Sequence, residues 1–240
     1  MALVTGAGRG IGRVIARMFV AEGAQVLAAD FTGEQDDTAA ELGSAVVPFH
    51  ADVTSEADIE AMFARAIEAF GRVDTSIHVA GNPGGRRGDE ISQEEFDLNI
   101  AVHLKGMMFC CKHAVRAMIP NGGGSIVNFS SAASFNYDPM ISFAYSSAKA
   151  GINSLTKGYA GRYGAQGIRV NGIAPGFTLS EKNLTVPESA AAMLRGKAAL
   201  ARAGTSEEQA SVAVFLASDR SSFVTGATIP VDGGWTSRLA

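Results

Sequence analysis

The sequence predicts an α/β fold in which helices cover both faces of a doubly wound, mostly parallel sheet of seven strands. Short runs rich in β-branched residues alternate with segments of helical periodicity along all 240 residues. No linker rich in Pro or Ser and no internal repeat interrupts this alternation. Strands that alternate with helices form parallel sheets that are buried on both faces. We therefore expect a single domain that spans residues 1–240.

Composition excludes several classes of partner. The chain is 47% hydrophobic and 18% charged, and no stretch approaches the roughly 20 consecutive apolar residues of a membrane helix. The formal net charge is −4 and the basic residues occur singly, so the positive patch typical of nucleic-acid binding is missing. Met1 is followed by a strand rather than by a signal peptide. We expect a cytoplasmic protein that binds neither nucleic acid nor membranes and holds no metal.

Seven apolar runs have the length and the β-branched content of buried strands. They cover residues 2–4, 25–30, 45–50, 74–79, 125–129, 168–173 and 228–231. Between them, three pairs of residues have the spacing of a helix-capping box, namely Ser55 with Asp58, Ser92 with Glu95, and Ser206 with Gln209. Gly71 marks a helix end. Cys110 and Cys111 are adjacent in a helical stretch, where their side chains diverge, so we expect two reduced core thiols rather than a disulfide.

Two irregular segments, 82–91 and 174–187, each follow the end of a predicted strand. Ligands of open α/β sheets bind in the crevice outside the carboxyl ends of the strands. We therefore expect the ligand site at this edge, with a substrate-side segment over about residues 174–197.

The glycine-rich segment 5–12 lies directly between the first strand and the first helix. A tight turn, a pyrophosphate close to the backbone and free N–H groups at a helix start together favour glycine at such positions. The motif therefore predicts a dinucleotide site that includes Gly6, Gly10, Ile11 and Gly12.

A carboxylate identifies the form of the dinucleotide. Asp30 ends the second strand, 30 − 12 = 18 residues after Gly12, close to the roughly 20-residue spacing of a ribose-binding carboxylate. A carboxylate repels a 2′-phosphate, so NAD is favoured over NADP, although Arg9 beside the turn argues for NADP. Asp52 and its neighbour Val53, after the third strand, are candidates for contacting the adenine, and a turn or capping role is the alternative for Asp52.

Tyr145 and Lys149 are four residues apart and therefore lie on one face of a helix, about one turn from each other. A cation near a phenol stabilises the phenolate, so that a tyrosine with an ordinary pKa of about 10 can exchange a proton near neutral pH. A tyrosine and a lysine at this spacing are common on solvated helices. Their occurrence together with the dinucleotide motif favours a catalytic pair.

Taken together, these motifs resemble those of the short-chain dehydrogenase/reductase family over essentially the whole chain. The residues that carry the resemblance are Thr5–Gly12, Ala80-Gly81, Ser130-Ser131, Tyr145 with Lys149, Asn171, Pro175-Gly176 and Val231–Gly234. The resemblance implies a Rossmann-type fold, a nicotinamide cofactor and a homotetramer paired through the helices around 98–118 and 145–163.

The resemblance also implies a role for each residue of the catalytic group. Ser131 would hydrogen-bond the substrate oxygen, Tyr145 would exchange its proton, and Lys149 would hold the nicotinamide ribose and tune Tyr145. On the cofactor side, the corresponding residues are Ala80, Gly81, Pro175, Gly176 and Thr178. The expected activity is the NAD(H)-dependent interconversion of a secondary alcohol and a ketone, with Tyr145 as general acid and base.

The chain departs from the family pattern at three places. His78 and Val79 replace two asparagines, which predicts an altered cofactor floor. His103 replaces an asparagine that anchors a water of the proton relay, and it either relays protons itself or merely packs in a helix. Ser131 lies 145 − 131 = 14 residues before Tyr145, one more than the usual spacing, so Ser130 is an alternative to Ser131.

The substrate-facing residues are predicted to be mostly apolar, which favours a neutral, hydrophobic alcohol or ketone. They come from Phe135, Tyr137, Met140 and Phe143, from the loop after Gly81 and from the segment 177–195. Arg86, Arg87 and Arg195 could bind an acid group instead if they fold inward. We keep three other functions as alternatives: a sugar-nucleotide-modifying enzyme, a non-catalytic dinucleotide-binding regulator and a nucleotide-dependent methyltransferase. Retention of Ser131, Tyr145 and Lys149 together argues against the regulator.

Overall fold

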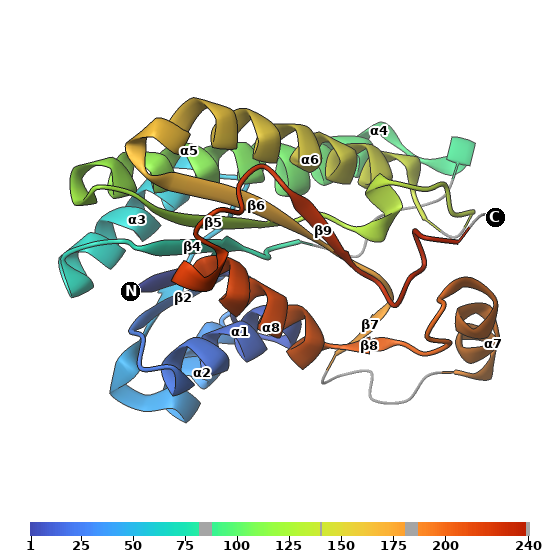
Figure 1. Ribbon diagram of the computed structural model, residues 1–240, viewed down its shortest axis with the longest axis horizontal. Coiled ribbons are helices and arrows are strands. Elements are labelled where there is room, and N and C mark those ends of the chain that lie inside the picture. Colours follow the sequence, from blue (N-terminus) through green and yellow to red (C-terminus); the bar gives the residue numbers. More distant parts are fainter. Residues whose placement is uncertain (82–87, 140, 181–186, 239–240) are drawn as a thin grey trace.

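The computed structural model describes residues 1–81, 88–139, 141–180 and 187–238, which form a central sheet of seven strands between two layers of helices (Figure 1). The strand order is β3-β2-β1-β4-β5-β6-β9, and every adjacent pair is parallel. The strands are β1 (Ala2–Thr5), β2 (Val26–Asp30), β3 (Val46–His50), β4 (Thr75–His78), β5 (Gly124–Phe129), β6 (Ile168–Pro175) and β9 (Thr228–Val231). All seven predicted strands are confirmed.

The helices divide between the two faces of the sheet. One face is covered by α1 (Gly10–Ala21), α2 (Gln35–Leu42) and α8 (Ser206–Ala217), and the other by α3 (Glu56–Phe70), α4 (Gln93–Asn99), α5 (Gly106–Met118) and α6 (Phe143–Tyr163) (Figure 1). Each layer buries its own hydrophobic core. Because side chains alternate along a strand, Leu3 of β1 packs in the core with α3 and α5, and Val4 packs in the core with α1 and α8.

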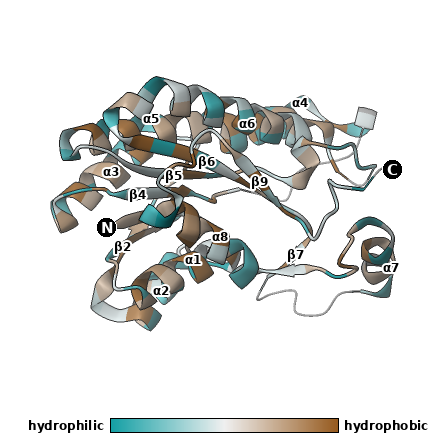
Figure 2. Cartoon of the chain, in the orientation of Figure 1, coloured by the Kyte–Doolittle hydropathy of each residue, from teal (hydrophilic) through white to brown (hydrophobic). Residues whose placement is uncertain are grey.

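Figure 2 shows hydrophobic residues on the strands and hydrophilic residues on outward-facing helix surfaces. Beyond the sheet, α7 (Glu188–Lys197) lies beside two short strands, β7 (Thr178–Leu179) and β8 (Gly204–Thr205), which pair in parallel (Figure 1). No helix in the described ranges combines the length and the apolar character that crossing a bilayer requires.

Two of the three predicted helix starts are confirmed. The Ser55 hydroxyl accepts a hydrogen bond from the Asp58 backbone, and Ser92 with Glu95 forms a complete capping box. The predicted pair Ser206 and Gln209 is wrong by one residue, since Thr205 caps α8 and Glu208 closes the box. Thr205 has the extended backbone that a cap requires, whereas Ser206 is already helical. Gly71 ends α3 in the left-handed conformation, as predicted.

His78, at the end of β4, is buried in the core of the fold. Its Nδ1 lies 2.9 Å from Asn128 Oδ1 and its Nε2 lies 2.8 Å from Ser76 Oγ. Because an amide oxygen only accepts, Nδ1 donates and Nε2 accepts from Ser76. Burial lowers the pKa of His78 to about 4, so the ring is neutral at pH 7. Cys110 and Cys111 are both free and buried, as expected.

Candidate active site

Two adjoining cavities lie at the carboxyl ends of the strands, on either side of the point between β1 and β4 where the strand order reverses. One, of about 750 Å³, is lined by the ends of β1, β2 and β3 and is called the adenosine-side cavity below. The other, of about 740 Å³, is lined by Ser131, Tyr145 and Lys149 and is called the substrate-side cavity. The two cavities share part of their walls, because four residues line both: Ile11, Val79, Gly81 and Thr178.

The turn between β1 and α1 leaves no room for side chains at two glycines. Gly6 has a φ of +70°, and a Cβ there would lie 2.9 Å from the Ala80 backbone nitrogen. A Cβ on Gly12 would lie 2.1 Å from the Gly6 carbonyl oxygen. The start of α1 therefore packs directly on the turn, and its free N–H groups are at the edge of the adenosine-side cavity.

Asp30 is fixed at the end of β2 by three hydrogen bonds. Its Oδ2 accepts from the Gly8 N–H at 3.0 Å, and its Oδ1 accepts from both the N–H and the hydroxyl of Thr32, at 3.0 and 2.9 Å. The carboxylate lines the adenosine-side cavity. A charge held in this way stays in place when a ligand enters.

The other residues predicted on this side are placed as follows. Arg9 lines the cavity, but its Nε lies 3.6 Å from Glu34 Oε2, so its charge is already partnered by a carboxylate. Asp52 lines the cavity with Val53, and its Oδ1 also accepts from the Thr54 N–H at 2.8 Å, which is the turn role considered as the alternative. Gly10 lines a separate pocket with Arg13 rather than either main cavity.

Tyr145 and Lys149 lie one turn apart on α6, as predicted. Lys149 Nζ is 5.5 Å from the centre of the Tyr145 ring and donates to the Phe129 carbonyl oxygen at 2.8 Å. Burial lowers the pKa of Lys149 to about 7. Burial raises the pKa of Tyr145, and a hydrogen bond with Ser131 opposes this rise. In the ligand-free site the phenol is therefore protonated at neutral pH, and Lys149 is close to its titration point.

The two adjacent serines after β5 face different partners. Ser131 hydrogen-bonds Tyr145 and lines the substrate-side cavity. The Ser130 hydroxyl lies within hydrogen-bond distance of the Lys149 carbonyl oxygen and of Ser134 Oγ, at 3.0 and 3.1 Å. The geometry therefore brings Ser131 to Tyr145, while Ser130 connects the end of β5 to α6.

His103 lies beside the catalytic tyrosine. The chain from 100 to 105 forms a π-helical segment between α4 and α5, and it places His103 in the wall of the substrate-side cavity. The ring is 1% exposed and meets the Tyr145 ring edge to face, with centres 5.0 Å apart. A Cβ on Gly81 would lie 2.8 Å from His103 Cε1, so glycine at 81 leaves space for the imidazole.

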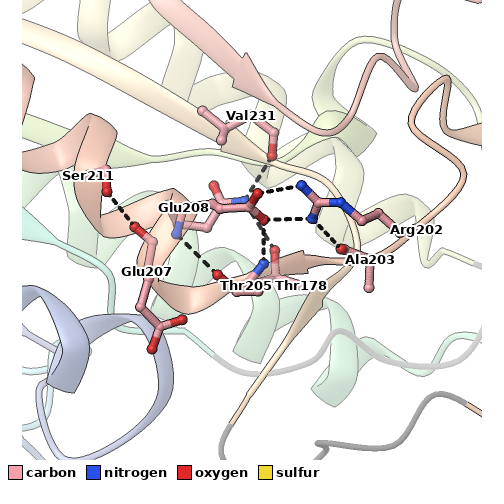
Figure 3. Close-up of polar contacts among 9 residues, drawn as sticks. Thr178, Arg202, Ala203, Thr205, Glu207, Glu208, Ser211 and Val231 are labelled. Atoms are coloured by element: carbon pink, nitrogen blue, oxygen red, sulfur yellow. Dashed lines mark hydrogen bonds and ion pairs between the residues drawn. The ribbon is translucent and has the colours of Figure 1, made fainter.

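The cap of α8 helps to hold Thr178, which lines both cavities. Arg202 and Glu208 face each other with two contacts of 2.9 and 2.6 Å beside the Thr205 cap (Figure 3). From the next residue of α8, Gln209 Nε2 donates to Thr178 Oγ1 at 3.3 Å and to the Val231 carbonyl oxygen at 2.9 Å. Pro175 and Gly176 precede Thr178 and line the substrate-side cavity.

The substrate-facing residues differ from the expectation. Phe135, Tyr137 and Phe143 are exposed and are missing from the described lining of the cavity. The same loop instead contributes Asp138, which pairs with Lys197 and is thereby stabilised in a buried position. Met140, Arg86 and Arg87 lie outside the described residues. Arg195 is exposed and pairs with Glu188.

Sequence reasoning missed several lining residues. Gly8 stood in the predicted glycine turn, and its N–H contact with Asp30 depends on how β2 meets that turn. Ser142 and Trp235 line the substrate-side cavity and were not expected there, whereas Ser189 and Met193 belong to the expected segment 177–195. Ser142 and Trp235 come from separate segments that only the fold brings together, so no local motif marks them.

The geometry fits a dinucleotide. The crowded glycine turn, the fixed carboxylate of Asp30 and the buried ammonium of Lys149 all line one continuous wall. The turn offers its backbone to a pyrophosphate, and Asp30 offers an acceptor for ribose hydroxyls. Lys149 offers a hydrogen-bond donor on the substrate side.

Comparisons with known proteins agree with this geometry. A family model described as enoyl-(acyl carrier protein) reductase matches residues 6–236. The chain is 36% identical over 236 residues to a 3-oxoacyl-[acyl-carrier-protein] reductase of Thermotoga maritima, a match that covers 97% of this chain and 96% of the relative. It is 37% identical over 240 residues to a cis-4-hydroxycyclohexanecarboxylate dehydrogenase of Sinomonas cyclohexanicum, with 98% and 96% covered.

A solved structure gives the same result for the fold. A short-chain type dehydrogenase/reductase from Mycobacterium ulcerans superimposes with a TM-score of 0.93 at 32% identity, over 100% of this chain and 90% of that chain. Sequence, fold and site geometry agree, and the chain belongs to the short-chain dehydrogenase/reductase family of oxidoreductases, which use a nicotinamide dinucleotide.

Proposed function

We propose that this protein interconverts a secondary alcohol and a ketone with NAD(H), and that Tyr145 is the general acid and base. The observation that carries the proposal is the convergence of Ser131, Tyr145 and Lys149 on one cavity that adjoins the dinucleotide wall. Relatives whose names specify an alcohol substrate, among them a 2,5-dichloro-2,5-cyclohexadiene-1,4-diol dehydrogenase of Sphingobium indicum at 36% identity, support the reaction class.

The residues perform the proton half of the reaction. A bound nicotinamide would accept the hydride from the carbinol carbon or return it to the carbonyl carbon. In the oxidative direction the tyrosinate form of Tyr145 takes the proton of the substrate hydroxyl as the carbonyl forms, and in reduction the phenol form gives its proton to the oxygen. Ser131 holds the same oxygen by a hydrogen bond. Lys149, when protonated, stabilises the tyrosinate, because a cation lowers the pKa of a nearby phenol.

Asp30 and Glu34 support NAD over NADP. The Asp30 carboxylate lines the adenosine-side cavity, where it would accept hydrogen bonds from ribose hydroxyls and repel a 2′-phosphate. Arg9, which could have recruited that phosphate, is paired with Glu34.

We also propose that residues 1–240 form one cytoplasmic domain and that four copies assemble into a homotetramer.

The Tyr145→Phe variant tests the mechanism. A positioned acid or base contributes about 10²- to 10⁴-fold to the rate, so turnover of a secondary alcohol should fall by at least 10²-fold. Binding of NADH should change little, since the ring still packs and the glycine turn is untouched. Tyr163→Phe, at the other end of α6, is the matched control and should keep its activity. The mechanism fails if Tyr145→Phe retains more than about a tenth of the turnover while proton transfer limits the rate.

A further inference from the structure

Two polar side chains in the wall of the substrate-side cavity have no role in the proton transfer proposed above. They are Asp138, in the loop between β5 and α6, and Ser142, immediately before α6. Both are buried, with 6% and 3% of their surfaces exposed. A buried polar group costs free energy unless a hydrogen bond compensates it. We therefore asked what each group can bind.

Ser142 is positioned to contact a ligand. It occupies the N-cap of α6, where a serine hydroxyl ordinarily accepts a hydrogen bond from the first turn of the helix. Its side chain makes no such cap. Within the described part of the chain, Ser142 Oγ is buried and has no hydrogen-bond partner. Ser142 lines the cavity, and a rotation of its side chain would turn the buried hydroxyl toward a molecule inside the cavity that supplies the missing hydrogen bond.

Asp138 brings an acceptor to the same cavity. Lys197 Nζ, at the end of α7, lies 2.7 Å from Asp138 Oδ2 and also 5.3 Å from the centre of the Trp235 ring. The ion pair balances the charge of the carboxylate, so the pair as a whole does not attract an anion. A carboxylate has about four acceptor sites, and Asp138 can therefore also accept a hydrogen bond from a ligand hydroxyl.

We propose that Asp138 and Ser142 form a subsite for a second hydroxyl group of the substrate, distinct from the hydroxyl that is oxidised. This inference rests on the proposed function and specifies its substrate class. The substrate is a neutral compound with at least two hydroxyl groups, such as an alicyclic diol or a sugar. Its apolar surface contacts Ile141, Met193 and Trp235, which line the same cavity. A simple hydrophobic alcohol would leave Ser142 and Asp138 without this hydrogen bond.

The first experiment compares matched substrates. The values of kcat/KM for 1,2-, 1,3- and 1,4-cyclohexanediol are measured beside that for cyclohexanol, all with NAD. A site that hydrogen-bonds a hydroxyl discriminates strongly against the analogue that lacks it. We expect at least one diol to exceed cyclohexanol by tenfold or more. Values for all three diols within twofold of cyclohexanol would overturn the proposal.

Variants locate the preference in these two residues. Ser142→Ala should lower kcat/KM for the preferred diol about fivefold and leave cyclohexanol within twofold, with an unchanged Tm because the hydroxyl caps nothing. Ser147 is exposed on the same helix, and Ser147→Ala should leave kcat/KM unchanged for both substrates.

Asp138→Asn should also lower kcat/KM for the preferred diol more than it lowers kcat/KM for cyclohexanol. Lys197→Gln breaks the same ion pair without removing the carboxylate, and it should affect both substrates alike. Equal losses on both substrates in Ser142→Ala and Asp138→Asn would contradict the subsite.

A binding measurement separates this proposal from the proposed function. Trp235 is the only tryptophan of the sequence and lines the cavity, so its fluorescence reports occupancy without turnover. In the NADH complex, the preferred diol should have a Kd at least tenfold below that of cyclohexanol. If no alcohol or ketone is turned over and the diol still binds in this way, the proposed function fails and the subsite stands. If alcohols are oxidised with no diol preference in rate or in binding, the subsite fails and the function stands.

Discussion

Lys149 combines a catalytic position with a cost in stability. Its side chain is 4% exposed, and burial lowers its pKa from 10.5 to about 7. Between these two pH values the unfolded chain binds a proton that the folded protein does not, so the free energy of unfolding rises with pH across this window. Near pH 6 the folded protein contains a buried ammonium, at a cost on the order of 5 kcal/mol. A variant that lacks the ammonium also loses the hydrogen bond to the Phe129 carbonyl oxygen, which costs about 1–3 kcal/mol.

The Lys149→Met variant should therefore be more stable than the parent protein at pH 6, by about 2–4 kcal/mol, while losing activity. Denaturant unfolding measures the difference. The gain should shrink as the pH rises towards 10, where the native lysine is neutral. Lys157→Met, at an exposed position of the same helix, should change stability by less than about 0.5 kcal/mol. A gain that does not depend on pH would show that packing rather than charge is responsible.

Asp30 should determine the choice of cofactor. We expect NAD(H) to bind more tightly than NADP(H), and Asp30→Ala to narrow the preference, because the variant loses both the ribose acceptor and the repulsive charge. Asp30→Asn keeps one acceptor oxygen for the Thr32 contacts and removes the charge together with the acceptor for the Gly8 N–H. Fluorescence titration measures the affinities of NADH and of NADPH for the parent protein and for each variant. A tenfold preference of the parent protein for NADP(H), about 1.4 kcal/mol, would show that Arg9 outweighs Asp30.

At the residue scale, sequence spacing predicts contacts within one element and misses contacts between elements. Tyr145 and Lys149 share a helix, so helical geometry alone places them one turn apart. Asp138 and Lys197 are separated by 59 residues, and only the packing of α7 against the loop before α6 brings them together. For the same reason, the aromatic residues around Asp138 were expected in the substrate wall, where the structure has the carboxylate.

Among the elements, the π-helical segment 100–105 is the one with a direct bearing on chemistry. Single π-helical turns recur at functional sites because the wider turn redirects side chains. Here the segment joins α4 to α5, and it directs His103 against Tyr145. The sequence predicts one helix through this region, because hydrophobic periodicity does not distinguish a π-helical turn from an α-helix.

The role of His103 can be tested by removing its proton-transfer capacity. If the imidazole takes part in the relay, His103→Phe should slow turnover about tenfold, less than the loss of a direct donor, and should shift the pH profile of kcat. His103→Asn should recover part of the rate, since an amide can still hydrogen-bond a water. His50→Asn, at an exposed position at the end of β3, is the control. A change in Tm alone, with an unaltered pH profile, would assign His103 to packing.

Most of the strands were predictable because they are short runs rich in β-branched or apolar residues, and β1, β2 and β4 are buried throughout. The two-residue strands β7 and β8 carry no such pattern, and they pair across 204 − 178 = 26 residues of the chain, Thr178 with Gly204 and Leu179 with Thr205. The start of α8 shows the limit of capping signals, since Thr205 and Ser206 are both good caps, and the backbone conformation rather than the sequence selects Thr205.

On the scale of the whole molecule, several exposed apolar side chains lie on α4, α5 and α6. Phe96 and Leu98 of α4, Met108 of α5 and Phe143 of α6 are each about half exposed. We expect a homotetramer paired through the surfaces of these three helices rather than through α3, since symmetric closed assemblies bury such faces. Sedimentation should give about four times 24.8 kDa. Met108→Glu should reduce that mass, and Ile67→Glu on α3 should not. A monomer mass at micromolar concentration would contradict the assembly.

The two cavities share a wall but draw most of their lining from different parts of the chain. The adenosine side depends mainly on residues 5–54, and the substrate side mainly on residues 129–142 and 175–193 with Trp235. Selection can therefore change one lining while the other keeps its sequence, which is how one scaffold acquires many substrates. The same division favours directed evolution, because a library confined to Asn136, Asp138, Ser142, Ser189 and Met193 samples new specificities without touching the pyrophosphate turn.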